Sequence, residues 1–543
     1  MLSPLSKLPP NAKVGVVGGG VSGLMFTYFL SKLRSDIKIT LFEGEKRTGG
    51  WINSWNTADQ NGASVMLERG PRTLRGVSDG TVVIMDTMND LGKSDSIRCV
   101  EKYATANRKF LLGPNDKLVQ VPNSFGSFLK FATSPLSKGL FTGIAGEMFR
   151  KSSSTPGKDE SVRTMLNRRY GNDFIASNLM SAIYHGIYAD DISTLSAQKT
   201  SGKVFYTELK HGSVLRGSIK EYIRNRFGKK QPETLSGCLK LYQRAFNKDT
   251  GALLKLSNHL KKYPMLGFVG GLETFPKTIR KELDNIRNVE IVTGSAVTKM
   301  YKDSKNSTMS VKLSTNERID GFDHLRITVT PQILSTLITS TYGDLIKDLK
   351  KVKSNTVILI NYYLPNKEII RPEIQSFGYL IPQSNTNPAN ILGVIFDSVI
   401  EKNFKSFNID DANPSRLEVS SSGQSSELQY TKLTIMVGGH LLNENGKTKI
   451  PAEATCLADV KSALETHLNV SREDLDNGLW VYTVAKECFP HYFIGYKDWQ
   501  NKLEKTLLTT YDNKISLGGM GFAKGPGVPD VIVDGLQDAL KLK

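Results

Sequence analysis

The 543-residue sequence predicts a mixed α/β fold (α+β overall), with a Rossmann-like nucleotide-binding domain, a sheet-based second domain and a mostly helical insert. Three observations lead to this prediction. A strand, a glycine-rich turn, a helix and another strand follow one another near the N-terminus, and a glycine-rich turn followed by a helix returns near the C-terminus. Between them, residues 264–400 hold several short runs of β-branched residues that are typical of strands.

The first βαβ unit begins with Lys13–Val17, whose length and valine content indicate a buried strand. Apolar residues then recur at helical spacing over residues 21–29, and residues 37–42 indicate a second strand. The rest of the chain predicts strands at residues 117–122, 289–293, 326–330, 356–363, 392–397 and 514–517, and a final helix at residues 531–540.

The turn between the first strand and the first helix has the pattern Gly18-x-Gly20-x-x-Gly23, and Glu43 follows the second strand. The first glycine permits a tight turn, the second lets the backbone approach a pyrophosphate, and the third lets the helix pack on the strand. The helix N-terminus attracts phosphates, and the Glu43 carboxylate can accept hydrogen bonds from a ribose diol. The motif predicts a dinucleotide site and leaves NAD, NADP and FAD open.

Two further glycine-rich segments bear on the cofactor. Residues 47–51 (Arg-Thr-Gly-Gly-Trp) come just after Glu43, and an R-x-G-G at this place resembles the superfamily of FAD-dependent oxidases and desaturases that includes monoamine oxidases. Residues 518–522 (Gly-Gly-Met-Gly-Phe), continuing to residues 527–530, resemble that superfamily's late turn, whose helix faces the flavin. The resemblance implies FAD. Arg47 can meet phosphate charge, and a positive helix end favours the reduced, anionic flavin.

The composition limits the range of partners. There are 71 Lys and Arg against 53 Asp and Glu, a net charge of +18, which suits nucleic acid, a membrane surface or a small carboxylate. The four cysteines are far apart and no HxxxH pair occurs, so neither a disulfide framework nor a metal site is expected. No apolar run approaches the ~18 residues of a membrane-spanning helix, and residues 1–13 fit either a mitochondrial targeting segment or a short lead-in.

Residues 121–151 interleave aromatic and aliphatic residues with lysines and arginine. This pattern is typical of a monotopic membrane anchor, in which apolar groups enter the bilayer and lysines meet anionic headgroups. A helical cap over a substrate pocket is the alternative, and one segment can serve both purposes. Polar residues 152–160, basic residues 224–232 and serine-rich residues 420–426 indicate exposed loops.

Motifs over essentially the whole chain resemble the family of oxygen-dependent protoporphyrinogen oxidases, in its fungal mitochondrial form. They occur in the family's order at residues 68–75 (Glu-Arg-Gly-Pro-Arg-Thr-Leu-Arg), 170–171, 186–189, 195–197, 377–382, 392–398, 436–439 and 488–490. The resemblance implies oxidation of protoporphyrinogen IX to protoporphyrin IX in haem biosynthesis, by hydride transfer to flavin with oxygen reduced to hydrogen peroxide. It also implies a peripheral or monotopic position on the mitochondrial inner membrane.

The resemblance also implies site residues. The cofactor-binding candidates are Gly18, Gly19, Gly20, Val21, Ser22, Gly23, Glu43, Gly44, Arg47, Gly50, Trp51, Gly70, Pro71, Arg72, Thr73, Val297, Met520, Gly527, Val528 and Pro529. The substrate candidates are Arg108 or Lys109 for a propionate, and Phe377, Leu380 and Leu392 for apolar walls. No residue is nominated as a catalyst, because in this superfamily the flavin carries the chemistry.

The expected division alternates between domains: FAD-binding at residues 1–90, 231–300 and 481–543, a helical membrane-binding and substrate-capping insert at 91–230, and a substrate-binding sheet domain at 301–480. The expected partners are protoporphyrinogen IX, molecular oxygen and an anionic membrane surface, with a homodimer and contact with the next haem-pathway enzyme as further expectations. Another flavin amine oxidase or desaturase, and a non-catalytic lipid-binding protein of the GDP-dissociation-inhibitor type, stay open as alternatives. Nucleic acid is not expected, because the basic residues are not tied to a recognised module.

Overall fold

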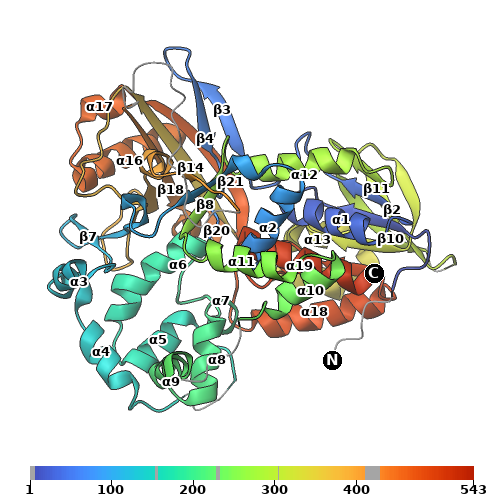
Figure 1. Cartoon of the computed structure of the whole chain (residues 1–543), viewed down its shortest axis with the longest axis horizontal. Coiled ribbons are helices and arrows are strands. Elements are labelled where there is room, and N and C mark those ends of the chain that lie inside the picture. The colour runs from blue at the N-terminus through green and yellow to red at the C-terminus, as the bar shows by residue number, and fades with distance from the viewer. Residues whose placement is uncertain (1–6, 153–156, 228–232, 304, 410–428, 445) are drawn as a thin grey trace.

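The structure is a computed structural model that describes residues 7–152, 157–227, 233–303, 305–409, 429–444 and 446–543 (Figure 1). It has the predicted mixed α/β fold, with two main sheets and a separate group of helices. Residues 153–156 and 228–232 of two predicted loops, and the serine-rich residues 420–426, lie outside the described residues.

The first main sheet has five parallel strands in the order β22-β13-β1-β2-β9. Its strands are β1 (Lys13–Val17), β2 (Lys38–Phe42), β9 (Val289–Val292), β13 (His324–Ile327) and β22 (Ile515–Leu517). Apart from the exposed Lys13 and Lys38 at their starts and the partly buried Thr40, the residues of β1 and β2 are buried, as in parallel sheets generally. Helices α1 (Val21–Leu33) and α19 (Val528–Leu542) pack against each other. The prediction of a Rossmann-like domain is confirmed.

This sheet joins segments that are far apart in the sequence. Strand β13, which the expected division gave to the substrate domain, pairs with β1 on one side and with β22 on the other. Arg326 of β13 is fully buried and pairs with Asp534 (2.5 Å) and Asp538 (2.7 Å) of α19. Because both carboxylates neutralise a guanidinium that would otherwise be buried unpaired, they hold the C-terminal helix to the sheet.

The second main sheet has seven strands in the order β21-β14-β18-β16-β15-β6-β7, antiparallel except where β15 meets β6. They are β6 (Phe110–Leu112), β7 (Leu118–Gln120), β14 (Ser354–Pro365), β15 (Gly378–Leu380), β16 (Ile391–Ile395), β18 (Tyr430–Gly438) and β21 (Leu479–Pro490). Strands β6 and β7 come from residues 91–230, which were expected to be mostly helical. They pair with this sheet, so the helical part of that stretch begins only after them.

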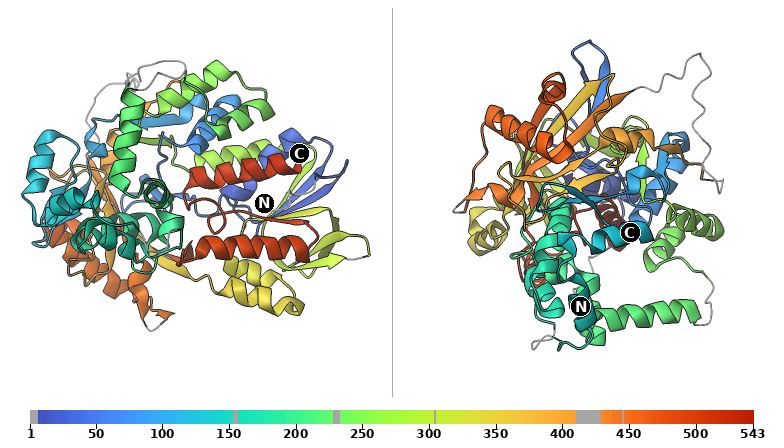
Figure 2. Two further views of the ribbon diagram at one scale, coloured as in Figure 1. Left: turned by 90° about the horizontal axis from the view of Figure 1, so that it is seen from below. Right: turned by 90° about the vertical axis from the view of Figure 1, so that its left-hand side faces the viewer.

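The helical insert follows β7. Its helices are α3 (Phe125–Ala132), α4 (Leu140–Glu147), α5 (Val162–Tyr170), α6 (Ser181–Tyr188), α7 (Ala197–Thr200), α8 (Gly202–His211) and α9 (Val214–Phe227). Glu147 and Arg169 form a buried ion pair that ties α4 to α5. Helix α9 buries only Gly217, and in the right-hand view of Figure 2 it extends away from the other insert helices.

One predicted loop is wrong. Arg224 and Arg226 were expected in an exposed loop of residues 224–232, but they lie in the last turns of α9. Arginine is a good helix former, and neither glycine nor proline occurs at residues 218–227. Basic composition alone therefore did not indicate a break in the helix.

The other elements connect these units. They are α2 (Asp79–Asp90), α10 (Gly237–Ala245), α11 (Thr250–Leu260), α12 (Thr274–Asp284), α13 (Pro331–Leu337), α14 (Gly343–Lys350), α15 (Asp397–Lys402), α16 (Glu453–Leu468), α17 (Arg472–Asp476), α18 (Tyr496–Thr510), β3 (Ser54–Ala58), β4 (Ser64–Glu68), β5 (Ile97–Val100), β8 (Met265–Phe268), β10 (Val297–Asp303), β11 (Thr308–Leu313), β12 (Arg318–Phe322), β17 (Lys405–Ser406), β19 (Asn443–Glu444) and β20 (Lys447–Thr448). Within the described ranges, no helix combines the length and the apolarity needed to cross a membrane.

Candidate active site

The first glycine-rich turn forms an open cradle at the N-terminus of α1. Gly18 has a φ of +106° and donates its N–H to the carbonyl of Phe42 (2.8 Å). A Cβ atom on Gly23 would lie 2.0 Å from the Gly18 carbonyl oxygen, so only glycine lets α1 start this close to the turn. The nearest atom to a Cβ on Gly20 is Gly50 Cα at 3.8 Å, and no side chain caps the helix. The open space and the uncapped N–H groups suit a phosphate.

Glu43 lies beside this cradle at the end of β2. Its Oε2 atom accepts the N–H of Gly19 (2.7 Å), and its Oε1 atom accepts the backbone N–H two residues further on (2.9 Å). These bonds hold the carboxylate where a ribose diol can reach it. A Cβ on Gly44 would meet Ala296 at 3.0 Å, so Val297, the first residue of β10, lies near the same corner.

The R-x-G-G segment packs against the cradle. Gly49 donates its N–H to the carbonyl of Gly19 (2.8 Å). The Arg47 guanidinium donates to the carbonyl of Gly50 (2.5 Å) and pairs with Glu273 (3.1 Å). Arg47 therefore holds the segment in shape, and its predicted contact with phosphate charge stays a prediction.

Residues 70–73 form the next predicted cofactor segment. A Cβ on Gly70 would lie 1.9 Å from the carbonyl oxygen of Trp51, so this segment packs against the R-x-G-G segment. Arg72 pairs with Asp397 of α15 at 2.5 Å, and both side chains are only 8% exposed. A cavity of about 240 Å³ borders the segment. The buried ion pair thus joins the cofactor segments to the second sheet domain.

A chain of buried hydrogen bonds continues from Asp397. Its Oδ2 atom accepts from the Thr434 hydroxyl (2.7 Å), which in turn accepts from the Asn361 amide (2.8 Å). Asn361 also donates to the carbonyl of Glu68 (3.1 Å). The Glu68 carboxylate accepts from the Ser54 hydroxyl (2.8 Å), and burial raises its pKa to about 7. Sequence analysis did not identify Asp397, Thr434 or Asn361 as site residues, because only strand pairing brings them beside the cofactor segments.

The late glycine-rich turn lies beside the first one. Thr328, directly after β13, donates its hydroxyl to the carbonyl of Gly18 (2.9 Å), and its own carbonyl would meet a Cβ on Gly519 at 2.8 Å. Thr328 thus joins the two turns, although no motif indicated it. Helix α19 begins directly after Gly527, with Pro529 in its first turn and no side-chain cap.

These features fit a flavin dinucleotide. The Ser22 hydroxyl, a predicted contact, is buried and has no hydrogen-bond partner. The N–H groups of Met520 and Gly521 are also without partners in the described part of the chain. Open space at the first turn and free donors at the late turn match the two ends of such a cofactor. Among the described residues, no three His, Cys, Asp or Glu side chains are grouped to hold a metal ion.

The structure separates the two cations considered for a propionate. Arg108 donates to the carbonyl of Pro372 (3.2 Å), whereas Lys109 has only a 3.4 Å contact with the Asn107 side chain. The Lys109 residue as a whole is exposed. Loss of water around its ammonium group, and the positive charge of the nearby Arg75, lower its pKa. Neither cation has an acidic partner among the described residues, but backbone carbonyls hold Arg108, so Lys109 is the freer of the two for an anionic ligand.

The three apolar candidates do not form one wall. Leu392 is buried in a small cluster with Leu359, and Leu380 contacts Gly186 of α6. The backbone N–H that follows Leu380 donates to the carbonyl of Leu392 (3.2 Å), so these two are neighbours. Phe377 instead packs against the separate core that includes helix α16. The structure therefore places Leu380 and Leu392 on paired strands, with their side chains in different apolar clusters, and leaves Phe377 in a packing role.

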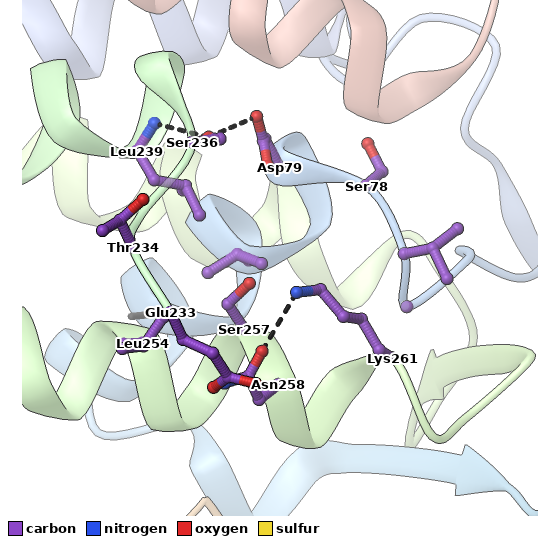
Figure 3. Close-up of a pocket in the computed structure, with 13 residues that line it drawn as sticks. Ser78, Asp79, Glu233, Thr234, Ser236, Leu239, Leu254, Ser257, Asn258 and Lys261 are labelled. Atoms are coloured by element: carbon purple, nitrogen blue, oxygen red, sulfur yellow. Dashed lines mark hydrogen bonds between the residues drawn. The ribbon is translucent and has the colours of Figure 1, made fainter. Parts of the chain in front are cut away.

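A second cavity of about 240 Å³ lies between α2, α10 and α11 (Figure 3). The Ser236 hydroxyl donates to Asp79 (2.7 Å), and Lys261 donates to the Asn258 side chain (3.0 Å). None of the predicted site residues lines this cavity, so it is separate from the candidate active site.

Comparisons with known proteins identify the family of the chain. The model of the flavin containing amine oxidoreductase family matches residues 21–385. The chain is 52% identical to the protoporphyrinogen oxidase of Saccharomyces cerevisiae, over 100% of both chains. It is 25% identical to the protoporphyrinogen oxidase of Homo sapiens, over 97% of this chain and 98% of that protein.

A solved structure is similar in fold. The crystal structure of a putative protoporphyrinogen oxidase from Exiguobacterium matches with a TM-score of 0.67 and 17% identity, over 98% of this chain and 99% of that one. The family match, the full-length similarity and the arrangement of glycine-rich turns lead to the same assignment. The chain belongs to the flavin containing amine oxidoreductases, and within them to the protoporphyrinogen oxidase family.

Proposed function

We propose that this protein oxidises protoporphyrinogen IX to protoporphyrin IX with FAD as hydride acceptor, reducing oxygen to hydrogen peroxide, as a step of haem biosynthesis. The observation that carries the proposal is the 52% identity over the full length to a protein named protoporphyrinogen oxidase. The geometry supports it, because segments from both ends of the chain meet around one cradle that fits a flavin dinucleotide.

The chain's own residues have distinct tasks at the cofactor. The turn at Gly18–Gly23 and the N-terminus of α1 would bind the pyrophosphate, and Glu43 would hold the ribose. The free N–H groups of Met520 and Gly521 and the N-terminus of α19 would favour negative charge at the flavin end. Bound FAD would supply the hydride acceptor. The protein then has to orient the substrate and exclude water.

The substrate end needs an apolar surface and a cation. A porphyrinogen loses a meso hydride and an N–H proton in each of three rounds of oxidation, and it carries two propionates. Leu380 and Leu392 supply part of an apolar wall, and Lys109 is the cation free to hold a propionate. Replacement of Lys109 by Ala should raise KM and leave FAD bound. Arg108→Ala is the matched control, because that side chain is held by backbone carbonyls.

We further propose that the protein lies on the mitochondrial inner membrane as a peripheral or monotopic protein. Exposed apolar side chains on α3 and after α4 support this proposal, namely Phe125, Phe128, Leu129 and Phe149. Lys130 and Lys138, nearby in the sequence, can meet anionic headgroups. A homodimer and contact with the next haem-pathway enzyme remain predictions.

One experiment tests the enzymatic proposal. The purified protein should show a flavin absorption spectrum that bleaches anaerobically with protoporphyrinogen IX and recovers in air with formation of hydrogen peroxide. Bleaching by amines or by phytoene instead would favour another amine oxidase or a desaturase. A colourless protein that takes up no FAD would favour the non-catalytic lipid-binding alternative.

A further inference from the structure

Four successive backbone carbonyls in the late turn each accept a hydrogen bond from a side chain outside the turn. The carbonyls belong to Met520, Gly521, Phe522 and Ala523, in that order. Their donors are Tyr492 (2.7 Å), Tyr496 (2.7 Å), Gln500 (2.6 Å) and Lys199 (2.8 Å). We call these four side chains the turn clamp. A run of four pinned carbonyls fixes the orientation of the peptide groups in that turn.

Three clamp residues follow helical spacing. Tyr496 and Gln500 lie one turn apart on α18, and Tyr492 precedes the helix by the same interval of four residues. Residues at this spacing share one face of a helix, so their polar ends reach consecutive positions along a neighbouring segment. Tyr492 and Tyr496 are fully buried, which leaves each hydroxyl dependent on its carbonyl partner.

The fourth clamp residue comes from a different unit. Lys199 belongs to α7 of the helical insert, and its ammonium group also donates to the Gln500 side chain (3.1 Å). It lies 5.4 Å from the ring centroids of both Tyr492 and Tyr496. The backbone carbonyl of Tyr492 accepts the N–H of Ser196 (2.8 Å), which fixes α7 against the start of α18. Lys199 is therefore a held cation and not a mobile surface charge.

The pinned carbonyls have a consequence for the other side of the turn. The Met520 carbonyl and the Gly521 N–H belong to one peptide group, so the bond from Tyr492 also orients that N–H. The Gly521 N–H has no partner within the described residues. A free N–H group in a glycine-rich turn favours negative charge beside it. The turn clamp thus keeps this donor available to a bound group.

We propose that Lys199 is a positioning residue for the flavin: it fixes the late turn through Ala523, and its ammonium charge favours the reduced, negatively charged cofactor. This inference rests on the FAD binding of the proposed function, but not on the identity of the substrate. The helical insert would then help to set the affinity of the protein for FAD and the midpoint potential of the bound flavin. None of the motifs in the sequence pointed to this residue.

The test compares Lys199→Met with the wild-type holoenzyme. The variant keeps a long unbranched side chain, and it removes both the charge and the bond to Ala523. We expect weaker FAD binding, measured by titrating apoprotein with FAD. We also expect the preference for reduced over oxidised flavin to fall about tenfold, which lowers the midpoint potential by about 30 mV for a two-electron couple.

Three further variants separate charge from packing. Lys199→Arg keeps the charge and a donor, and it should restore most of both properties. Tyr496→Phe removes one clamp bond without changing charge, so it should weaken FAD binding and leave the potential near the wild-type value. Lys497→Met is the matched control, because it removes a nearby exposed lysine that donates to Tyr206 (2.7 Å) and does not contact the turn. It should change neither property.

The results can overturn the proposal in two ways. Wild-type FAD affinity and potential in Lys199→Met would remove Lys199 from this role. An equal loss in Lys199→Arg and Lys199→Met would show that packing, and not charge, matters here. A wild-type protein that binds FAD but is not bleached by protoporphyrinogen would contradict the proposed function, and these measurements could still be made.

Discussion

At the scale of single residues, glycine decides where the cofactor fits. Gly23 is needed for packing, since a Cβ there would lie 2.0 Å from a carbonyl oxygen. Gly20 is different, because the space beside it is open and faces the R-x-G-G segment at 3.8 Å. The two glycines of one motif therefore serve different purposes, one for the fold and one for the ligand.

A substitution at Gly20 should affect binding and not folding. Gly20→Asp should weaken FAD binding by at least about a hundredfold, because the carboxylate fills the cradle and repels the pyrophosphate. Gly20→Ala tests the Cβ alone and should bind FAD with intermediate affinity. The visible spectrum of the purified proteins and an FAD titration measure both effects. A yellow Gly20→Asp protein with normal affinity would contradict this account of the cradle.

The charge of Lys199 should depend on pH. Burial lowers the pKa of Lys199 from 10.5 to about 8, and Glu504, Asp530 and Asp534 partly oppose this shift while Lys497 adds to it. Because the pKa in the folded protein is below the unfolded value, the unfolded chain binds more protons between about pH 8 and 10.5. This group therefore adds stability as pH rises through that window.

The midpoint potential of the bound flavin should change as Lys199 titrates. The difference in midpoint potential between the wild type and Lys199→Met should be largest below about pH 8 and should shrink as pH rises above it. Potentiometry at several pH values measures it. A difference that stays constant up to pH 10 would show that the ammonium charge is not its source.

At the scale of elements, the sequence predicts individual strands and turns, but it does not predict which distant strands pair. Strand β1 lies at the residues predicted from its apolar run, and the GxGxxG turn begins the helix as expected. The order of the strands in the first sheet was not predictable, since β1 pairs with a strand about three hundred residues away. The ion pair of Arg72 with Asp397 depends on such pairing, so neither its existence nor its burial could be inferred from the motif that contains Arg72.

That ion pair should matter for stability. Arg72→Met leaves Asp397 buried without its cation, and it should lower the free energy of unfolding by about 3–5 kcal/mol. The double variant Arg72→Met with Asp397→Asn should recover part of this loss. Denaturant unfolding of the apoprotein measures both. Lys347→Met, which breaks an exposed pair with Asp344 (3.8 Å), is the control and should cost about 0–1 kcal/mol. Equal effects in the two single variants would contradict a structural role for the buried pair.

At the scale of the whole molecule, the net charge of +18 suits the three anionic partners proposed above: cofactor phosphates, substrate propionates and a membrane surface. Part of the positive charge is neutralised within the protein, as in the pair of Arg47 with Glu273. On the helical insert, exposed apolar side chains lie close in sequence to lysines. Phe125 and Phe149 are 78% and 83% exposed.

Membrane binding should require both kinds of side chain. A variant with Phe125, Phe128, Leu129 and Phe149 changed to Ser should lose flotation with anionic vesicles by at least about tenfold, because each inserted apolar side chain contributes roughly 1.5–3 kcal/mol. Val269→Ser with Ile333→Ser removes exposed apolar groups elsewhere and should float normally. High salt should weaken wild-type flotation. Unchanged flotation of the insert variant would contradict the proposed anchor.

The assembly of the first sheet from distant segments has a consequence for how the protein is made. Strand β1 can pair with β13 only after about residue 327 has been synthesised, and β22 and α19 follow some two hundred residues later. Pairings of such sequence separation form slowly and only late in folding. The first glycine-rich turn can contact β2, Glu43 and Gly49 early in synthesis, whereas its contact with Thr328 can form only much later. The two glycine-rich turns can therefore hold FAD together only after residues 515–542 have been synthesised.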